Sequence, residues 1–223
     1  MRVLLFCDDF YHPGEIPAEG MRRIGLNLTE VFDPTGFDFS TLANYDTIVI
    51  SKCDHISQQN NEPWKTAEIQ RAFVEYVENG GGLLVTHSGT VAGENTQILD
   101  ELIGCRFASH PNNCPVTVGA VKPHPITDGV EIFCETDEHY HLKILAPDID
   151  IIAASFADAQ GTPHKYETEP YFNAPAHIAP SAYVRTHGKG RICVLTPGHS
   201  PEVWGNPEFA KMLTNAIRWC AKI

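Results

Sequence analysis

Short apolar segments alternate with segments of helical periodicity along this chain, and this alternation limits the fold more than any other feature. The expected strands are Arg2 to Cys7, Asp46 to Ser51, Leu83 to Val85, Val116 to Val121, Ile151 to Phe156, Ala182 to Thr186 and Arg191 to Leu195. The expected helices are Ala18 to Phe32, Pro63 to Glu78, Glu94 to Ile103 and a last helix that begins at Asn206. Such alternation predicts an α/β fold, a mostly parallel sheet with helices on both faces.

Length and charge narrow the class of protein. The 223 residues, 43% of them hydrophobic, fit one domain over residues 1–223. A formal charge of −12 without a basic run argues against nucleic acid and membrane surfaces as partners. The N-terminal apolar stretch is too short for a signal peptide. Seven scattered cysteines without a CxxC pair predict reduced thiols and a cytoplasmic location.

The stretch from Gly80 to Gly89 carries a histidine where a buried strand breaks into a turn. Glycines precede the apolar residues Leu83 to Val85, and Gly89 allows a sharp turn after His87. In open parallel sheets ligands bind beyond the carboxyl ends of the strands, so His87 is a candidate catalytic or metal-binding residue. The alternative is a histidine whose hydrogen bonds are satisfied within a loop.

A second histidine, His199, follows the expected strand Arg191 to Leu195 at the same rim of the sheet. Glu202 lies three residues further on and could orient His199 as a base. An acid at this position could equally cap the short turn in which it lies.

Residues 136–141 place two carboxylates, two imidazoles and a phenol together. In an extended chain Glu138 and Tyr140 share one face, and His139 and His141 share the other. His139 and His141 form an HxH pair that could bind zinc or a similar divalent ion. An exposed polar strand face explains the second set equally well.

Three further features leave alternatives open. His110 precedes a proline and therefore lies in an extended or turn conformation. The polar and aromatic segment Gly161 to Pro180 could be a lid or an interface. Cys7 ends the first strand, where the adjacent acids Asp8 and Asp9 would raise its pKa, so a core or rim cysteine is favoured over a reactive thiol.

Several of these motifs, taken in order, resemble the ThuA-like, or trehalose-utilisation, family across nearly the whole chain. They are GGGLLVTHSG, FASHP, HPITDGVEIFCETDEHY, THGKGRICVLTPGHS and the final NPEFAKMLTNAIRWCAK. The family is similar in fold to class I glutamine amidotransferases, so the resemblance implies a flavodoxin-like parallel sheet. It also implies pocket positions at His87, His110, Glu138, Tyr140 and His199, to which geometry adds Asp8 or Asp9.

The resemblance also implies what this chain lacks. Amidotransferases carry a cysteine nucleophile at the elbow after the strand, whereas here the elbow residue is His87. An imidazole cannot form the glutamyl thioester, so we do not expect glutamine hydrolysis. The pair His199 and Glu202 is also spaced by one residue more than the amidotransferase HPE pattern.

The leading hypothesis is a sugar-processing enzyme, a hydrolase, lyase or isomerase, acting on a disaccharide or keto-sugar. His87, Glu138, Tyr140 and His199 are its expected catalytic groups, by acid–base or metal-assisted chemistry. We assign substrate contacts to Asp8, Ser88, His110 and Glu202. The alternatives are a noncatalytic sugar-binding or partner-binding domain and a purely structural zinc site at His139 and His141. The chain could also form a homo-oligomer.

Overall fold

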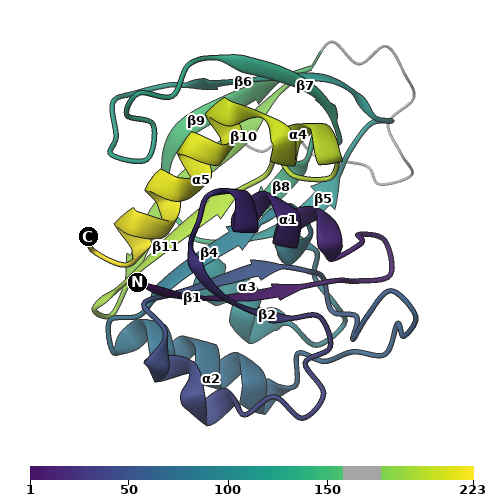
Figure 1. Cartoon of the computed structure of the whole chain (residues 1–223), viewed down its shortest axis with the longest axis vertical. Coiled ribbons are helices and arrows are strands. Elements are labelled where there is room, and N and C mark those ends of the chain that lie inside the picture. Colours follow the sequence, from purple (N-terminus) through teal and green to yellow (C-terminus); the bar gives the residue numbers. More distant parts are fainter. Residues whose placement is uncertain (158–176) are drawn as a thin grey trace.

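A computed structural model describes residues 1–157 and 177–223 and contains one large sheet with helices on both faces (Figure 1). The strands are Arg2–Cys7 (β1), Asn27–Val31 (β2), Thr47–Ser51 (β3), Gly82–Thr86 (β4), Cys105–Ser109 (β5), Cys114–Ala120 (β6), Phe133–Asp137 (β7), His141–Ile144 (β8), Asp150–Phe156 (β9), Ile178–His187 (β10) and Gly190–Leu195 (β11). The helices are Glu15–Arg23 (α1), Ala67–Glu78 (α2), Gln97–Ile103 (α3), Pro201–Gly205 (α4) and Pro207–Cys220 (α5), with 3-10 turns at Phe39–Asn44 (η1) and His87–Thr90 (η2).

The sheet has a parallel half and an antiparallel half. Within the described ranges its strand order is β2-β1-β3-β4-β11-β10-β9-β6-β7, and β5 and β8 form a separate pair. The first five strands run parallel, and each later strand is antiparallel to its neighbour. Strand β1 pairs with β2 on one side and with β3 on the other, so the connections from these strands run in opposite directions along the sheet. In open α/β sheets such a change of direction marks the place, at the carboxyl ends of the strands, where ligands bind.

Two apolar layers cover the sheet. On one face α1, α4 and α5 bury residues such as Met21, Trp204 and Phe209, and on the other face α2 and α3 bury Phe73 and Leu102. Burial of each such side chain contributes about 1.5–3 kcal/mol. The expected α/β fold with helices on both faces is therefore confirmed, and the antiparallel half extends it.

One expected helix was wrong in extent. The predicted helix from Ala18 to Phe32 ends at Arg23, and the chain then forms β2 beside β1. Gly25 has a φ of +72°, a left-handed conformation that ends a helix and that glycine adopts without steric cost. The apolar residues Leu28 and Val31 belong to the strand, so their spacing had only imitated a helical period.

Helix starts follow the sequence closely. Asn206 caps α5 by accepting hydrogen bonds from the N–H groups of Glu208 and Phe209, and Pro207 occupies the first turn. Thr66 caps α2 in the same way through the N–H of Ile69. Among the described residues, no helix combines the length and the apolar composition needed to span a membrane.

Candidate active site

Loops from several strands converge at the carboxyl rim of the parallel half. The loop after β1 brings His12, the turn after β4 brings His87, the loop after β11 brings His199, and the residue after β7 is Glu138. One nitrogen or carboxylate oxygen of each side chain lies within 4.8 Å of one such atom of every other. We call this set of four residues the rim cluster.

His87 occupies a strained turn. Its φ is +40°, in the left-handed region, where a residue with a Cβ costs about 1–2 kcal/mol. The turn is tight because Gly89 packs against the preceding strand β3: a Cβ on Gly89 would lie 2.3 Å from the backbone oxygen of Ile50. The imidazole of His87 is 1% exposed and stacks on Tyr140, with ring centroids 3.8 Å apart.

Three imidazoles are held by the same kind of hydrogen bond. The Nδ1 atoms of His87 and His110 lie 2.8 and 2.7 Å from the backbone oxygens of Thr196 and Pro111. A carbonyl oxygen only accepts, so these Nδ1 atoms carry the hydrogen. Each neutral ring therefore has its lone pair on Nε2. His12 follows the same pattern, because its Nδ1 lies 2.8 Å from Oδ1 of Asp9.

The remaining ring nitrogens face Glu138 or one another. Nε2 of His87 lies 3.3 Å and Nδ1 of His199 lies 3.2 Å from Oε2 of Glu138, while Nε2 of His110 lies 3.7 Å from Oε1. Nε2 of His12 is buried and has no hydrogen-bond partner within the part of the chain that the structure describes. A buried nitrogen without a partner is costly unless a ligand or ion completes the site.

Charge and burial set the protonation of this cluster. Burial alone would raise the pKa of Glu138, but the imidazoles of His199 and His87 lower it far below its usual range, so Glu138 is a carboxylate. The carboxylate of Glu138 in turn raises the pKa of His199. Burial lowers the pKa of His12, and burial followed by the charge of Glu138 raises that of Tyr140, so Tyr140 keeps its proton.

Two aspartates hold the loops that carry the histidines. Asp137 accepts hydrogen bonds from the backbone N–H groups of Gly198, His199 and Ser200. Because Asp137 ends the edge strand β7, this contact brings the antiparallel half of the sheet over the parallel rim and delivers Glu138 next to His87. In Figure 1 β7 lies beside α4, the helix that begins directly after this loop.

Asp9 plays the corresponding role for the loop after β1. Its Oδ1 accepts from the N–H groups of Tyr11 and His12, and its Oδ2 accepts from the N–H of Cys53. Burial opposes ionisation, but the hydrogen bond and charge of His12 and these backbone bonds lower the pKa of Asp9 well below its usual range. An ionised Asp9 fixes the tautomer and orientation of His12.

The structure brings together five of the predicted site residues: His87, His110, Glu138, Tyr140 and His199. Asp8 instead joins two loops, because its carboxylate oxygens accept hydrogen bonds from the N–H groups of Gly14 and Gln58. Ser88 is buried within the turn η2. Glu202 is exposed in the first turn of α4, and the carboxylate beside His199 is Glu138.

His139 and His141 lie together on the opposite face of the segment, as the alternation predicted. Nε2 of His139 lies 3.0 Å from the hydroxyl of Ser155, and its Nδ1 lies 3.3 Å from Nε2 of His141. Burial, followed by the charge of His141, lowers the pKa of His139 to about 4. The facing nitrogens hydrogen-bond each other, and the metal prediction for this pair stays a prediction.

Sequence reasoning missed His12. The strand-end rule could have found it. His12 follows the first strand, three residues after Asp9, and so lies at the same rim of the sheet as His87 and His199. The candidate lid or interface at Gly161 to Pro180 lies mostly outside the described residues.

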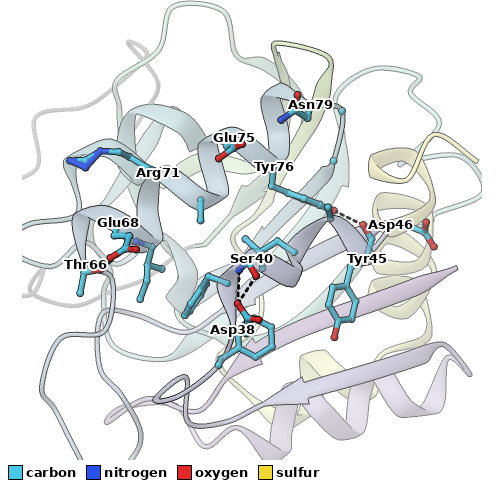
Figure 2. Close-up of a pocket in the computed structure, with 18 of the residues that line it drawn as sticks. Asp38, Ser40, Tyr45, Asp46, Thr66, Glu68, Arg71, Glu75, Tyr76 and Asn79 are labelled. Carbon is cyan, nitrogen blue, oxygen red and sulfur yellow. Dashed lines mark hydrogen bonds between the residues drawn. The ribbon is translucent and has the colours of Figure 1, made fainter.

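A hollow of about 1040 Å³ lies away from the rim cluster, between η1 and α2 (Figure 2). Its labelled groups belong largely to local structure: the hydroxyl of Tyr76 donates to the backbone oxygen of Tyr45, and Asp38 accepts from Ser40. Among the described residues, its lining contains no histidine or cysteine. The rim cluster is therefore the better candidate for chemistry.

Comparison with known proteins identifies relatives of this chain. The family model described as "ThuA: Trehalose utilisation" matches residues 2–220. A ThuA-like protein from Parabacteroides merdae ATCC 43184 has a similar structure, with a TM-score of 0.73, 17% sequence identity, and coverage of 99% of this chain and 90% of that chain. A ThuA-like protein from Bacteroides uniformis ATCC 8492 has a TM-score of 0.69 and 19% sequence identity, with 99% of this chain and 91% of that chain covered.

The same fold extends to a protein from Thermoplasma acidophilum that is described as part of a GMP synthase. That structure has a TM-score of 0.61 and 15% identity, with 100% of this chain and 94% of that chain covered. No curated protein sequence matches the chain. At these identities the solved structures show the glutamine amidotransferase-like fold alone.

Proposed function

Because the chain belongs to the ThuA family of trehalose utilisation, we propose that it is a carbohydrate-processing enzyme whose reaction takes place at the rim cluster. The observation that supports this most directly is the convergence of three imidazoles and one carboxylate, from four separate loops, within 4.8 Å of one another. Structural needs alone do not require such a convergence, and titratable groups gathered in a cleft are typical of active sites.

The rim cluster has the ligands for zinc or a similar divalent ion. His12, His87 and His199 offer imidazole nitrogens and Glu138 offers a carboxylate oxygen, a set that zinc commonly binds. The bonds to Asp9 and to the backbone oxygen of Thr196 orient the rings of His12 and His87 from behind, as at many metal sites. When bound, such an ion would polarise an oxygen of the sugar.

We therefore favour the rim cluster over His139 and His141 as the metal ligands. The nitrogens of those two residues already bind each other and Ser155. The donor set of the rim cluster also explains why Nε2 of His12 has no partner among the described residues.

Two groups beside this set are available for proton transfer and binding. His110 is 24% exposed, and its Nε2 lies near Oε1 of Glu138, so it can exchange protons between substrate and solvent. Tyr140 keeps its proton and can donate a hydrogen bond to a sugar hydroxyl.

The substrate that suits these groups is a disaccharide or its 3-keto derivative. A ketone makes the neighbouring carbon-bound hydrogen acidic, and a base at His110 could remove it. Elimination of a glycosidic group and isomerisation of the sugar both begin with this step. Addition of water to the unsaturated ketone that elimination leaves would complete a net hydrolysis, so the protein would act as a lyase, an isomerase or a hydrolase.

Glutamine hydrolysis is not part of this proposal. The elbow position carries His87, and burial raises the pKa of the nearby Cys53 thiol to about 12. A thiol with this pKa is a poor nucleophile at neutral pH.

The test is a product assay on a panel of disaccharides and 3-keto sugars, together with elemental analysis of protein purified without a histidine tag. We expect turnover of at least one keto-sugar by the wild type, its loss in His87→Ala and His199→Ala, and about one divalent ion per chain. His187→Ala is the matched control, because His187 lies outside the rim cluster beside Glu78. Sugar binding without any product would refute the enzyme and favour a binding domain.

A further inference from the structure

A second pocket of about 600 Å³ lies beside the rim cluster. It is bounded by the loops after β1 and β3, by the segment after η2 and by β5, which contribute Tyr11, His55, Glu94, Asn95 and Arg106. Its volume falls within the range of roughly 300–1,000 Å³ for small-molecule sites.

Aromatic rings form one wall of this pocket. Tyr11 is 63% exposed, and its ring centroid lies 5.6 Å from that of His55. Phe10, which is 50% exposed, packs edge-on against both rings. The sulfur of Cys53 lies 3.2 Å from Nδ1 of His55 and fixes the histidine ring. Solvent-exposed aromatic rings gathered beside a reactive cluster indicate a binding surface, because their apolar faces gain from being covered.

Polar side chains form the other wall. The guanidinium of Arg106, the carboxylate of Glu94 and the amide of Asn95 make no hydrogen bond or ion pair to any other described residue. Their donors and acceptors are therefore available to a ligand. A sugar ring combines an apolar face of C–H groups with hydroxyls around its edge, and a pocket with one aromatic wall and one polar wall matches both.

The pocket adjoins the rim cluster, because residues that line it are next to rim-cluster residues. Tyr11 directly precedes His12, and their ring centroids are 6.4 Å apart. The ring of His12 in turn lies 5.1 Å from that of His87. The opposite wall begins at Val91, directly after the turn that carries His87. The pocket and the rim cluster are therefore neighbours on the same rim of the sheet.

We propose that the pocket lined by Tyr11, His55, Glu94, Asn95 and Arg106 binds the second ring of a disaccharide whose reacting ring lies against the rim cluster. This inference rests on the proposed function and adds the residues that select a disaccharide over a monosaccharide. Tyr11 covers the apolar face of the second ring, and Arg106 with Asn95 binds its hydroxyls.

The test measures binding of trehalose and glucose by calorimetry, and turnover of their 3-keto derivatives, for wild type, Tyr11→Ala, Tyr11→Phe and Arg106→Ala. Arg71→Ala is the control for Arg106, since Arg71 lines the separate hollow of Figure 2. We expect Tyr11→Ala and Arg106→Ala to weaken trehalose binding about tenfold, and to raise KM for the keto-disaccharide similarly, with kcat and glucose binding little changed. Tyr11→Phe keeps the ring face and should stay close to wild type.

The outcomes separate this inference from the proposed function. Equal losses for both sugars, or no loss for either, would overturn the second-ring site while leaving the enzyme intact. If the wild type binds and converts none of the four sugars, the proposed function itself fails, and the second-ring site fails with it. Circular dichroism shows whether each variant has folded, and retained glucose binding shows that the site of the reacting ring is intact.

Discussion

Oδ1 of Asp9 lies 2.8 Å from Nδ1 of His12, and this contact leaves the opposite ring nitrogen of His12 pointing into the rim cluster without a partner among the described residues. A carboxylate behind a histidine in this way fixes its tautomer and makes its free nitrogen a better metal ligand. The pair therefore links the first strand of the sheet to the chemistry at its rim.

We expect Asp9→Asn to lower zinc affinity about 10–100-fold, the usual effect of removing such a supporting carboxylate. Asparagine is close to aspartate in size, and its amide oxygen can still accept the N–H of Cys53, but its NH2 group then faces the N–H groups of Tyr11 and His12, so circular dichroism checks that the variant is folded. Competition with a chromogenic chelator measures the affinity, and the exposed Asp148→Asn serves as the control. Unchanged affinity would mean that His12 is not a ligand.

The left-handed backbone of His87 predicts different stabilities for two variants that lose the same side chain. Both His87→Ala and His87→Gly remove the imidazole and should abolish activity. At a φ of +40° alanine keeps the steric strain and glycine relieves it, so the glycine variant should be more stable by about 0.5–1 kcal/mol. Urea denaturation compares the two. A more stable alanine variant would show that the turn relaxes when the imidazole is absent.

The sequence predicted the parts of this site that depend on local rules. Strand ends gave His87 and His199, and the alternation of side chains in an extended segment put Glu138 and Tyr140 on one face. His12 follows the same strand-end rule, but only the acids after the first strand had been considered there.

The remaining features depend on contacts between distant segments. Glu138 reaches His87 because Asp137, at the end of an edge strand, binds three N–H groups after β11, and no local pattern encodes that contact. The short segment from Leu28 to Val31 fits a helix or a strand equally well, and pairing with β1 decides between them.

Gly89→Ala should destabilise the protein by about 1–3 kcal/mol and reduce activity, because the added Cβ would lie 2.3 Å from the backbone oxygen of Ile50 and would push the turn of His87 away from β3. Gly119→Ala is the matched control. Its Cβ would meet only the side chain of Ile132, at 3.3 Å, which can move. Thermal denaturation ranks the two, and equal losses would contradict a specific role of the close approach at Gly89.

Asp100 provides a test of stability against pH at a position outside the rim cluster. This carboxyl lies on α3, is 5% exposed and accepts a hydrogen bond from the hydroxyl of Thr96. Burial raises its pKa to about 6, although the charges of Arg106 and Lys65 oppose the shift. The folded protein therefore holds a proton on Asp100 at pH values where the unfolded chain has released it.

A raised pKa in the folded state gives a stabilising contribution that is fully present below the unfolded value near 4 and is lost as the pH rises through about 6. Asp100→Asn removes this dependence, because an amide stays neutral and can still accept from Thr96. Relative to wild type, the variant should gain stability between pH 4 and pH 7, by up to about 3 kcal/mol. Urea denaturation at the two pH values measures the gain, with Asp148→Asn as an exposed control. A variant that gains nothing between them would mean that Asp100 is ionised in the folded protein throughout this range.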